Sequence, residues 1–162
     1  MDSGFFDYPD ADSTASRAAA DFRFLPDWTE EEWARLLRHV AARPFRAGET
    51  VIRAGDHERS LMIVADGRLD VFFRGGPLGR EIRRQSCDAG SVIGEQAFLD
   101  GFPRSATIRA VTDGRLMQLT LEAFEAFSGH WPALSKRFLF DLGRIVSLRL
   151  RRANALLERE GR

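Results

Sequence analysis

The pattern of apolar and polar positions divides the chain into a helical beginning, a β-rich middle and a helical end. Apolar residues recur at helical spacing over residues 30–40, and Thr29 with Glu32 forms a capping box, so we predict an amphipathic helix that packs on the domain. From residue 44 to residue 120 the pattern changes to short alternating segments separated by glycine, which indicates β-strands. The predicted strands are 50–54, 60–65, 68–74, 80–87, 105–111 and 115–119.

Turns that contain glycine separate these segments. Asp66-Gly67 and Asp113-Gly114 are dipeptides that tight hairpin turns favour, and a longer turn is expected at 75–79. We therefore expect each of these turns to join two antiparallel neighbours in a sheet. Many short strands at this spacing are typical of a β-barrel or β-roll.

After residue 120 the helical period returns. A short helix is predicted at 121–127 and a long helix at 132–158, with Pro132 suited to a first helical position. An apolar stripe with alternating spacings of four and three follows the long helix: Leu139, Gly143, Val146, Leu150, Ala153 and Leu157. This spacing suits helix pairing, and such a helix is on the order of 38 Å long, so we predict a homodimer through the stripe. Alternatively, the stripe covers the β-roll of its own chain.

Composition sets the class of protein. The chain has 162 residues, of which 44% are hydrophobic, and it contains no apolar run near membrane-spanning length, so we expect one domain at 21–162 and no membrane association. Residues 1–20 are rich in Asp, Ser and Ala, which predicts a flexible N-terminal tail. The 24 basic residues balance 24 acidic residues, so no overall basic character favours nucleic acid.

The metal-ligating residues are few. The single cysteine, Cys87, excludes an intrachain disulfide and predicts a reducing, cytoplasmic location. His39, His57 and His130 are far apart in sequence and lack a second ligand at metal spacing. We therefore expect no bound metal and no other cofactor.

A candidate anion site begins at Gly94. Glycine lets the chain turn closely around a ligand, and the helix-compatible run that follows offers free N–H groups at its start. Arg104 can grip two oxygens of one phosphate, and Ser105 adds a hydroxyl donor. Glu95 would repel the same anion, so we expect it to accept a hydrogen bond from a neighbouring hydroxyl such as a ribose 2′-OH. Together these groups suggest a nucleotide site.

The segment from Gly94 to Thr107 reads G-E-x-A-x-x-x-x-x-P-R-S-A-T and resembles the phosphate-binding cassette of the cyclic nucleotide-binding domain family. The resemblance implies an α+β, mainly β fold: an eight-stranded antiparallel β-roll, or jelly roll, with an N-terminal helix, a short cassette helix and a long C-terminal helix. It also implies that cAMP or cGMP lies across the cassette, with its cyclic phosphate on Arg104 and its ribose hydroxyl on Glu95. The ligand-binding residues that it predicts in the cassette are Gly94, Glu95, Gln96, Ala97, Arg104, Ser105 and Ala106.

The surroundings of the purine follow from the same resemblance. The base is expected on the strands opposite the cassette, with Cys87 as a small apolar contact and Arg149 of the C-terminal helix as a lid over either purine. The residues predicted to surround the purine are Val71, Arg84, Cys87, Val92 and Arg149. Which of cAMP and cGMP is preferred stays open.

The layout of residues 22–158 resembles the ligand-binding half of the catabolite activator protein class. In that class a helix-turn-helix domain follows the long helix, whereas this sequence ends at Arg162, so no DNA contact is expected. The predicted function is a stand-alone cAMP or cGMP receptor that transmits ligand binding through its C-terminal helix to a protein partner.

Two other functions remain open at this point. One is a receptor for another phosphate-bearing signal such as cyclic di-GMP, for which Arg84 and Arg149 would supply a second basic contact. The other is a ligand-free structural dimer module, in which Glu95 and Arg104 would form an internal ion pair. An enzyme is not expected, because the cassette offers neither a positioned base nor a metal-bound water.

Overall fold

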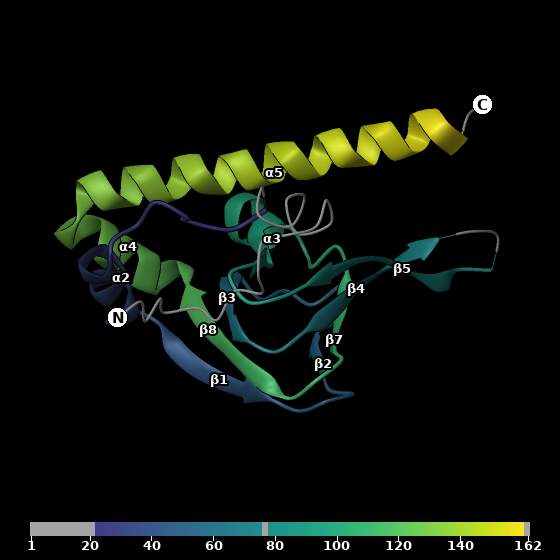
Figure 1. Ribbon diagram of the computed structural model, residues 1–162, viewed down its shortest axis with the longest axis horizontal. Coiled ribbons are helices and arrows are strands. Elements are labelled where there is room, and N and C mark those ends of the chain that lie inside the picture. Colours follow the sequence, from purple (N-terminus) through teal and green to yellow (C-terminus); the bar gives the residue numbers. More distant parts are fainter. Residues whose placement is uncertain (1–21, 76–77, 161–162) are drawn as a thin grey trace, which may run out of the picture.

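A computed structural model describes residues 22–75 and 78–160 of the chain. Its helices are α2 (Glu30–Leu37), α3 (Glu95–Asp100), α4 (Leu121–His130) and α5 (Pro132–Glu160). Its strands are β1 (Ala41–Phe45), β2 (Thr50–Ile52), β3 (Ser60–Asp66), β4 (Leu69–Gly75), β5 (Arg80–Cys87), β6 (Val92–Ile93), β7 (Thr107–Ala110) and β8 (Gly114–Thr120). The predicted fold is confirmed: a mainly β-roll with an N-terminal helix, a cassette helix and a long C-terminal helix (Figure 1).

The strands form two antiparallel sheets of four strands each, in the orders β1-β8-β3-β6 and β2-β7-β4-β5. Strand β3 is buried on both faces. Met62 and Val64 lie in the core between the sheets, while Leu61 and Ile63 lie in a second core that the helices cover. Because successive side chains of a strand point to opposite faces, these two burials explain why β3 reads as a continuous apolar run.

The prediction of hairpins at the two Asp-Gly turns is wrong. The turn at Asp66-Gly67 leads from β3 to β4, and the turn at Asp113-Gly114 leads from β7 to β8, and each pair of strands belongs to different sheets. The turns are corners of the roll, packed so closely that a Cβ on Gly114 would lie 2.3 Å from the Asp66 carbonyl oxygen. Glycine at a φ of +90°, as at Gly67, suits a corner as well as a hairpin, so the dipeptide does not identify the pairing partner.

Other boundaries differ more modestly from the prediction. The sequence pattern did not reveal β1 or β6, and the N-terminal helix ends at Leu37 rather than at residue 40. The strand expected at 105–111 is the shorter β7, whereas β4 and β5 pair as antiparallel neighbours as predicted. The expected tail at residues 1–20 lies outside the described residues.

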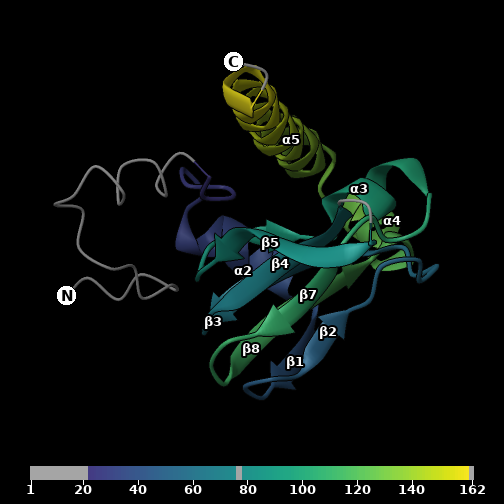
Figure 2. The same ribbon diagram turned by 90° about the vertical axis from the view of Figure 1, so that its right-hand side faces the viewer.

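Helix α5 crosses the molecule above the roll (Figure 1). Its first half packs against α4 and the roll through Leu134, Phe138, Leu142 and Ile145, all of which are buried. Its second half stands above the side of the roll that carries α3 and the β4–β5 ribbon, as the end-on view in Figure 2 shows. Across the described part of the chain, no helix has the length and apolar character to span a membrane.

The apolar stripe predicted on this helix is largely exposed. Leu139, Leu150 and Leu157 are 42%, 61% and 66% exposed. A Cβ added at Gly143 would meet no atom within 4 Å. The buried face of the first half is therefore a different one, but four stripe positions of the second half line a cavity against the roll of their own chain: Val146, Leu150, Ala153 and Leu157.

Candidate functional site

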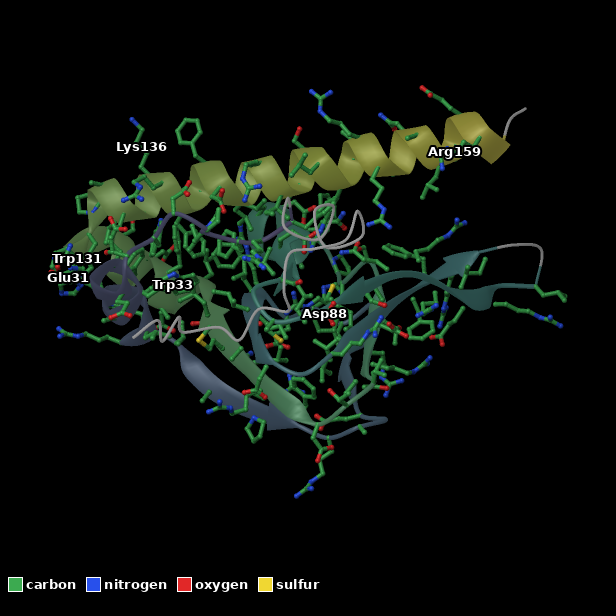
Figure 3. All side chains as sticks on the ribbon, in the orientation of Figure 1. Glu31, Trp33, Asp88, Trp131, Lys136 and Arg159 are labelled. Atoms are coloured by element: carbon green, nitrogen blue, oxygen red, sulfur yellow. The ribbon has the colours of Figure 1, made fainter. Side chains whose placement is uncertain are left out.

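A cavity of about 520 Å³ lies between the roll, α3 and the second half of α5. This volume falls within the usual range of small-molecule sites, about 300–1,000 Å³. Its walls are apolar where the roll provides them, through Ile52, Val71, Cys87, Ile93, Ala106 and Ile108. In Figure 3 the side chains of the roll and of α5 face one another below that half of the helix, whose far end is marked by Arg159. The polar groups gather at the cassette and along β5 and α5.

Gly94 caps the N-terminal end of α3 with a φ of +75°, a conformation that side chains rarely adopt. A Cβ at this position would lie 2.3 Å from Nη1 of Arg104 and 3.0 Å from the Ser60 carbonyl oxygen. Glycine is therefore required both by the backbone angle and by the space. The group that Gly94 approaches closely is the guanidinium of Arg104, whereas the close approach to a ligand stays a prediction.

Arg104 is buried and held by the backbone around it. Its Nη1 donates to the carbonyl oxygens of Ser60 at 2.7 Å and Gly94 at 3.0 Å, and its Nη2 donates to Ser60 Oγ at 3.0 Å. Glu58 is the nearest carboxylate that forms an ion pair with it, at 3.9 Å. Burial lowers the pKa of Arg104, and the charges of Glu58, Glu95 and Asp56 act in the opposite direction.

The Nε atom of Arg104 is buried and has no hydrogen-bond partner within the described chain. Such an unsatisfied donor is unusual in a folded protein and calls for an explanation. Because Arg104 also lines the cavity, an anion bound there can accept from it. The side chain is thus a fixed cation with donor capacity at the cassette end of the cavity.

Glu95, the first residue of α3, pairs with α5 rather than with Arg104. Its Oε1 lies 2.6 Å from Nη1 of Arg149, and Nη2 of Arg149 donates to the Val92 carbonyl oxygen at 2.6 Å. The internal Glu95–Arg104 pair expected of a ligand-free module is not formed. The carboxylate of Glu95 has a second oxygen with which it can accept a hydrogen bond from a ligand hydroxyl.

The structure brings the predicted cassette residues together. All seven line the cavity: Gly94, Glu95, Gln96, Ala97, Arg104, Ser105 and Ala106. Gln96 and Ser105 are exposed, so their side chains can reach a ligand from the solvent side. The cassette therefore forms one end of the cavity, and the binding role of its residues stays a prediction.

The residues expected around the purine are placed less uniformly. Val71, Arg84, Cys87 and Arg149 line the cavity, but Val92 does not. The side chain of Val92 is buried in the core beneath the helices, and its strand neighbour Ile93 faces the cavity instead. The choice of Val92 was wrong by one position, because neighbouring residues of a strand face opposite sides.

Cys87 is almost fully buried in the cavity wall, and this burial raises the pKa of its thiol to about 11. The thiol is protonated at neutral pH, so it acts as a small apolar contact. The amide nitrogen Nε2 of Gln85 lies 3.6 Å from its Sγ. Gln85 and Arg152, which also line the cavity, were not predicted as site residues.

The cavity is apolar and is closed at one end by a glycine-capped helix, a buried arginine and a buried glutamate, an arrangement that fits a small ligand with an anionic group. Residues 42–129, just over half of the chain, match the cyclic nucleotide-binding domain family. The chain belongs to this family, which binds cAMP or cGMP as a ligand.

Similar proteins come from several kinds of organism. The chain is 33% identical to the cGMP-dependent protein kinase egl-4 of Caenorhabditis briggsae over 63% of its own length and 13% of the kinase. It is 32% identical to the cAMP-dependent protein kinase regulatory subunit of Aspergillus niger over 68% of its length and 26% of that protein. The solved structure of the Thermus thermophilus catabolite activator protein superposes with a TM-score of 0.73 at 27% identity, covering 84% of this chain and 62% of that one. The chain thus spans a small part of these kinase relatives.

Proposed function

We propose that this domain is a cytoplasmic receptor for a nucleotide with a cyclic phosphate, cAMP or cGMP in the first instance, and that it binds this ligand without converting it. The observation that carries the proposal is the placement of Arg104 and Glu95 at one end of an apolar cavity. The kinase relatives are named for their dependence on cGMP and cAMP, which supports the same ligand class.

The phosphate is assigned to the guanidinium of Arg104. Its bonds to the backbone of Ser60 and Gly94 fix its orientation before ligand arrives, so little side-chain entropy is lost on binding. A charge-assisted bond to a phosphate oxygen would give Nε its missing partner. The exposed hydroxyl of Ser105 can donate to the same group.

The sugar and the base are assigned to the remaining walls. The ribose hydroxyl would donate to Glu95, and the purine would lie along the apolar wall that includes Val71 and Cys87. Arg149 as a lid over the base stays a prediction, because its guanidinium is engaged with Glu95 and Val92 in this structure. Binding would therefore have to share or rearrange the contact between Glu95 and Arg149.

This contact supports transmission through α5. Glu95 belongs to the cassette and Arg149 to the second half of the helix, so a hydroxyl that binds to Glu95 changes what holds this half. The ligand can then shift the helix between two positions according to its affinity for each. Leu150 and Leu157 line the cavity and are more than half exposed, so their surroundings would change with this shift. The stripe to which they belong would present the change to a second copy of the chain or to a protein partner.

Isothermal titration with cAMP and cGMP tests the proposal, after unfolding and refolding have removed carried-over nucleotide. Arg104→Gln should weaken binding by roughly 2–4 kcal/mol, because it removes a charge-assisted phosphate contact. Arg109→Gln is the matched control, since Arg109 lies on β7, pairs with Glu81 and does not line the cavity. Arg104→Lys, with its melting curve, separates loss of the phosphate contact from loss of folding. The proposal would be contradicted if neither cAMP nor cGMP bound to the wild type. It would also be contradicted if Arg104→Gln bound the nucleotide as tightly as the wild type.

A further inference from the structure

The guanidinium of Arg104 is held at one edge and free at another. Its Nη1 donates to the carbonyl oxygens of Ser60 and Gly94, and its Nη2 donates to Ser60 Oγ. Nε has no partner within the described chain, and Glu58 lies 3.9 Å from Nη2, beyond hydrogen-bond distance. Because Ser60 accepts from both terminal nitrogens, the terminal edge of the guanidinium faces Ser60.

The hydroxyl of Ser60 is itself fixed in orientation. Ser60 is the first residue of β3 and is 1% exposed. Its Oγ donates to Glu58 Oε1 at 2.8 Å and accepts from Arg104 Nη2 at 3.0 Å and from Gln118 Nε2 at 3.2 Å. A hydroxyl has one donor and two acceptor sites, so its whole hydrogen-bonding capacity is used. The O–H points to Glu58, and a lone pair is therefore left for Arg104.

The residues around this hydroxyl form a network outside the cavity. Glu58 Oε1 also accepts from Gln118 Nε2 at 2.5 Å, and the side chain of Glu58 is 49% exposed. The described lining of the cavity includes Arg104 but not Glu58, Ser60 or Gln118. The network therefore reaches the proposed ligand site through the guanidinium of Arg104.

We propose that Ser60 is a positioning residue that determines which edge of Arg104 meets the phosphate. By holding the terminal edge, it leaves Nε and the second N–H of Nη2 as the donors for the ligand. This fixed edge meets one exocyclic oxygen of the cyclic phosphate, and the other exocyclic oxygen faces Ser105. The inference rests on the proposed function, because it concerns the same phosphate.

Titration of the full chain with cAMP and with its two phosphorothioate diastereomers tests this role. In each diastereomer sulfur, a weak acceptor, replaces a different exocyclic oxygen. Wild type should bind one diastereomer at least about 10-fold more tightly than the other. Ser60→Ala should bind cAMP about 3-fold to 10-fold more weakly and reduce the ratio of the two affinities to within about 3-fold, because the guanidinium can turn. Ser60→Thr keeps the hydroxyl and should restore both values. The corresponding analogues of cGMP serve if cGMP is the nucleotide that binds.

Glu58→Ala tests the network from its exposed end, and it decides the question if Ser60→Ala does not fold. It removes a negative charge near Arg104, which changes the affinity for both diastereomers alike. The ratio of the two affinities therefore isolates the orientation of Arg104 from its charge. Without its acceptor, the hydroxyl of Ser60 can turn, and the ratio should fall at least about 3-fold.

Ser135→Ala is the matched control. Ser135 is also a buried serine, and its Oγ donates to the Pro132 carbonyl oxygen and accepts from Ser128 Oγ, both at 2.9 Å. Because Ser135 does not line the cavity or contact Arg104, Ser135→Ala should keep the wild-type ratio. A wild type without preference between the diastereomers, or an unchanged ratio in Ser60→Ala or Glu58→Ala, would overturn the positioning role and leave the proposed function intact. An equal fall of the ratio in Ser135→Ala would also overturn it, because the effect would then come from general loosening. If the wild type bound no cyclic nucleotide, the proposed function and this inference would both be refuted.

Discussion

The two halves of α5 share one continuous helix and differ in what holds them to the protein. In the first half, Phe138, Leu142 and Ile145 are completely buried against α4 and the roll. In the second half, Leu150 and Leu157 are mostly exposed, and Arg149 provides the polar attachment to the cassette and β6. Figure 3 labels Lys136 near the beginning of this helix and Arg159 near its end, and the roll lies below both halves.

This difference suggests that the first half of α5 anchors the helix to the domain, whereas the second half can respond to a ligand. Burial of a large apolar side chain contributes about 1.5–3 kcal/mol, whereas an ion pair contributes less once desolvation is counted. The first half is therefore held by the burial of several large apolar side chains. The second half is held by the ion pair between Arg149 and Glu95 of the cassette. A ligand in the cavity would meet the apolar side chains of the second half and add to their burial.

The largest expected effect tests how firmly the first half of α5 is packed. Phe138→Ala should lower the free energy of unfolding by about 3–5 kcal/mol, because the ring is completely buried and its removal leaves a cavity. Phe140→Ala is the control two residues later, where the ring is 72% exposed and the change should stay within about 0.5 kcal/mol. Urea unfolding monitored by fluorescence measures both. Similar losses for the two variants would show that the first half is not the anchored one.

The elements of this fold could be predicted from the sequence where they are long enough to show a clear period of apolar residues. The long helix and most strands had clear periodicity, and the capping box at Thr29 marked α2 correctly. Strand β1 was missed because Pro44 argues against a strand, and proline is tolerated at this position only because β1 lies at a sheet edge. Strand β6 has two residues, too few to show any period.

The site was predictable where it is local and unpredictable where it joins distant segments. Gly94, Glu95 and Arg104 lie within eleven positions, so their spacing carried the prediction. The pairing of Glu95 with Arg149 spans most of the second half of the domain and follows from how α5 lies over the cassette. A bulge makes Arg84 an extra residue in β5, and it depends on strand register, which an alternating pattern does not specify.

The next largest effect tests the attachment of the second half. Arg149→Met should lower the free energy of unfolding by about 1–3 kcal/mol, because it leaves the buried carboxylate of Glu95 without its cation. Glu95→Gln combined with Arg149→Met should recover part of this loss. Hydrogen exchange should rise in residues 146–160 and stay unchanged in 132–145. Equal increases in both segments would mean that α5 moves as one body, and the comparison would fail.

The stability of the core beneath the first half of α5 is expected to depend on pH. His39 packs its ring against Phe127 at 5.6 Å between ring centres, and His130 lies 5.9 Å away. Burial lowers the pKa of His39 from its usual 6.5, and the charges of His130 and Arg38 lower it further. Its neutral form is therefore favoured by folding, so this stability is present above pH 6.5 and is lost as the pH falls from there towards the lower folded-state value.

Melting curves between pH 7.5 and 5.5 measure this contribution. His39→Gln should show a smaller fall in melting temperature than wild type, because glutamine does not titrate. His57→Gln is the control, since His57 is exposed in the segment between β2 and β3. A steeper fall for His39→Gln than for wild type would mean that protonated His39 stabilises the fold, which is the opposite of what its burial predicts.

The smallest expected effect on folding concerns the exposed stripe, and it separates the stability of the chain from its assembly. Leu150→Ser combined with Leu157→Ser should change the free energy of unfolding of the monomer by only about 0.5 kcal/mol per site, because both side chains are more than half exposed. The same substitutions should weaken the proposed homodimer, since they remove apolar area from its interface. Sedimentation velocity over a range of concentrations measures the association, with Ser147→Ala as a control at an exposed position outside the stripe. A large loss of monomer stability would mean that the second half of α5 is packed as firmly as the first. Unchanged association would assign Leu150 and Leu157 to the cavity of their own chain, which both residues line.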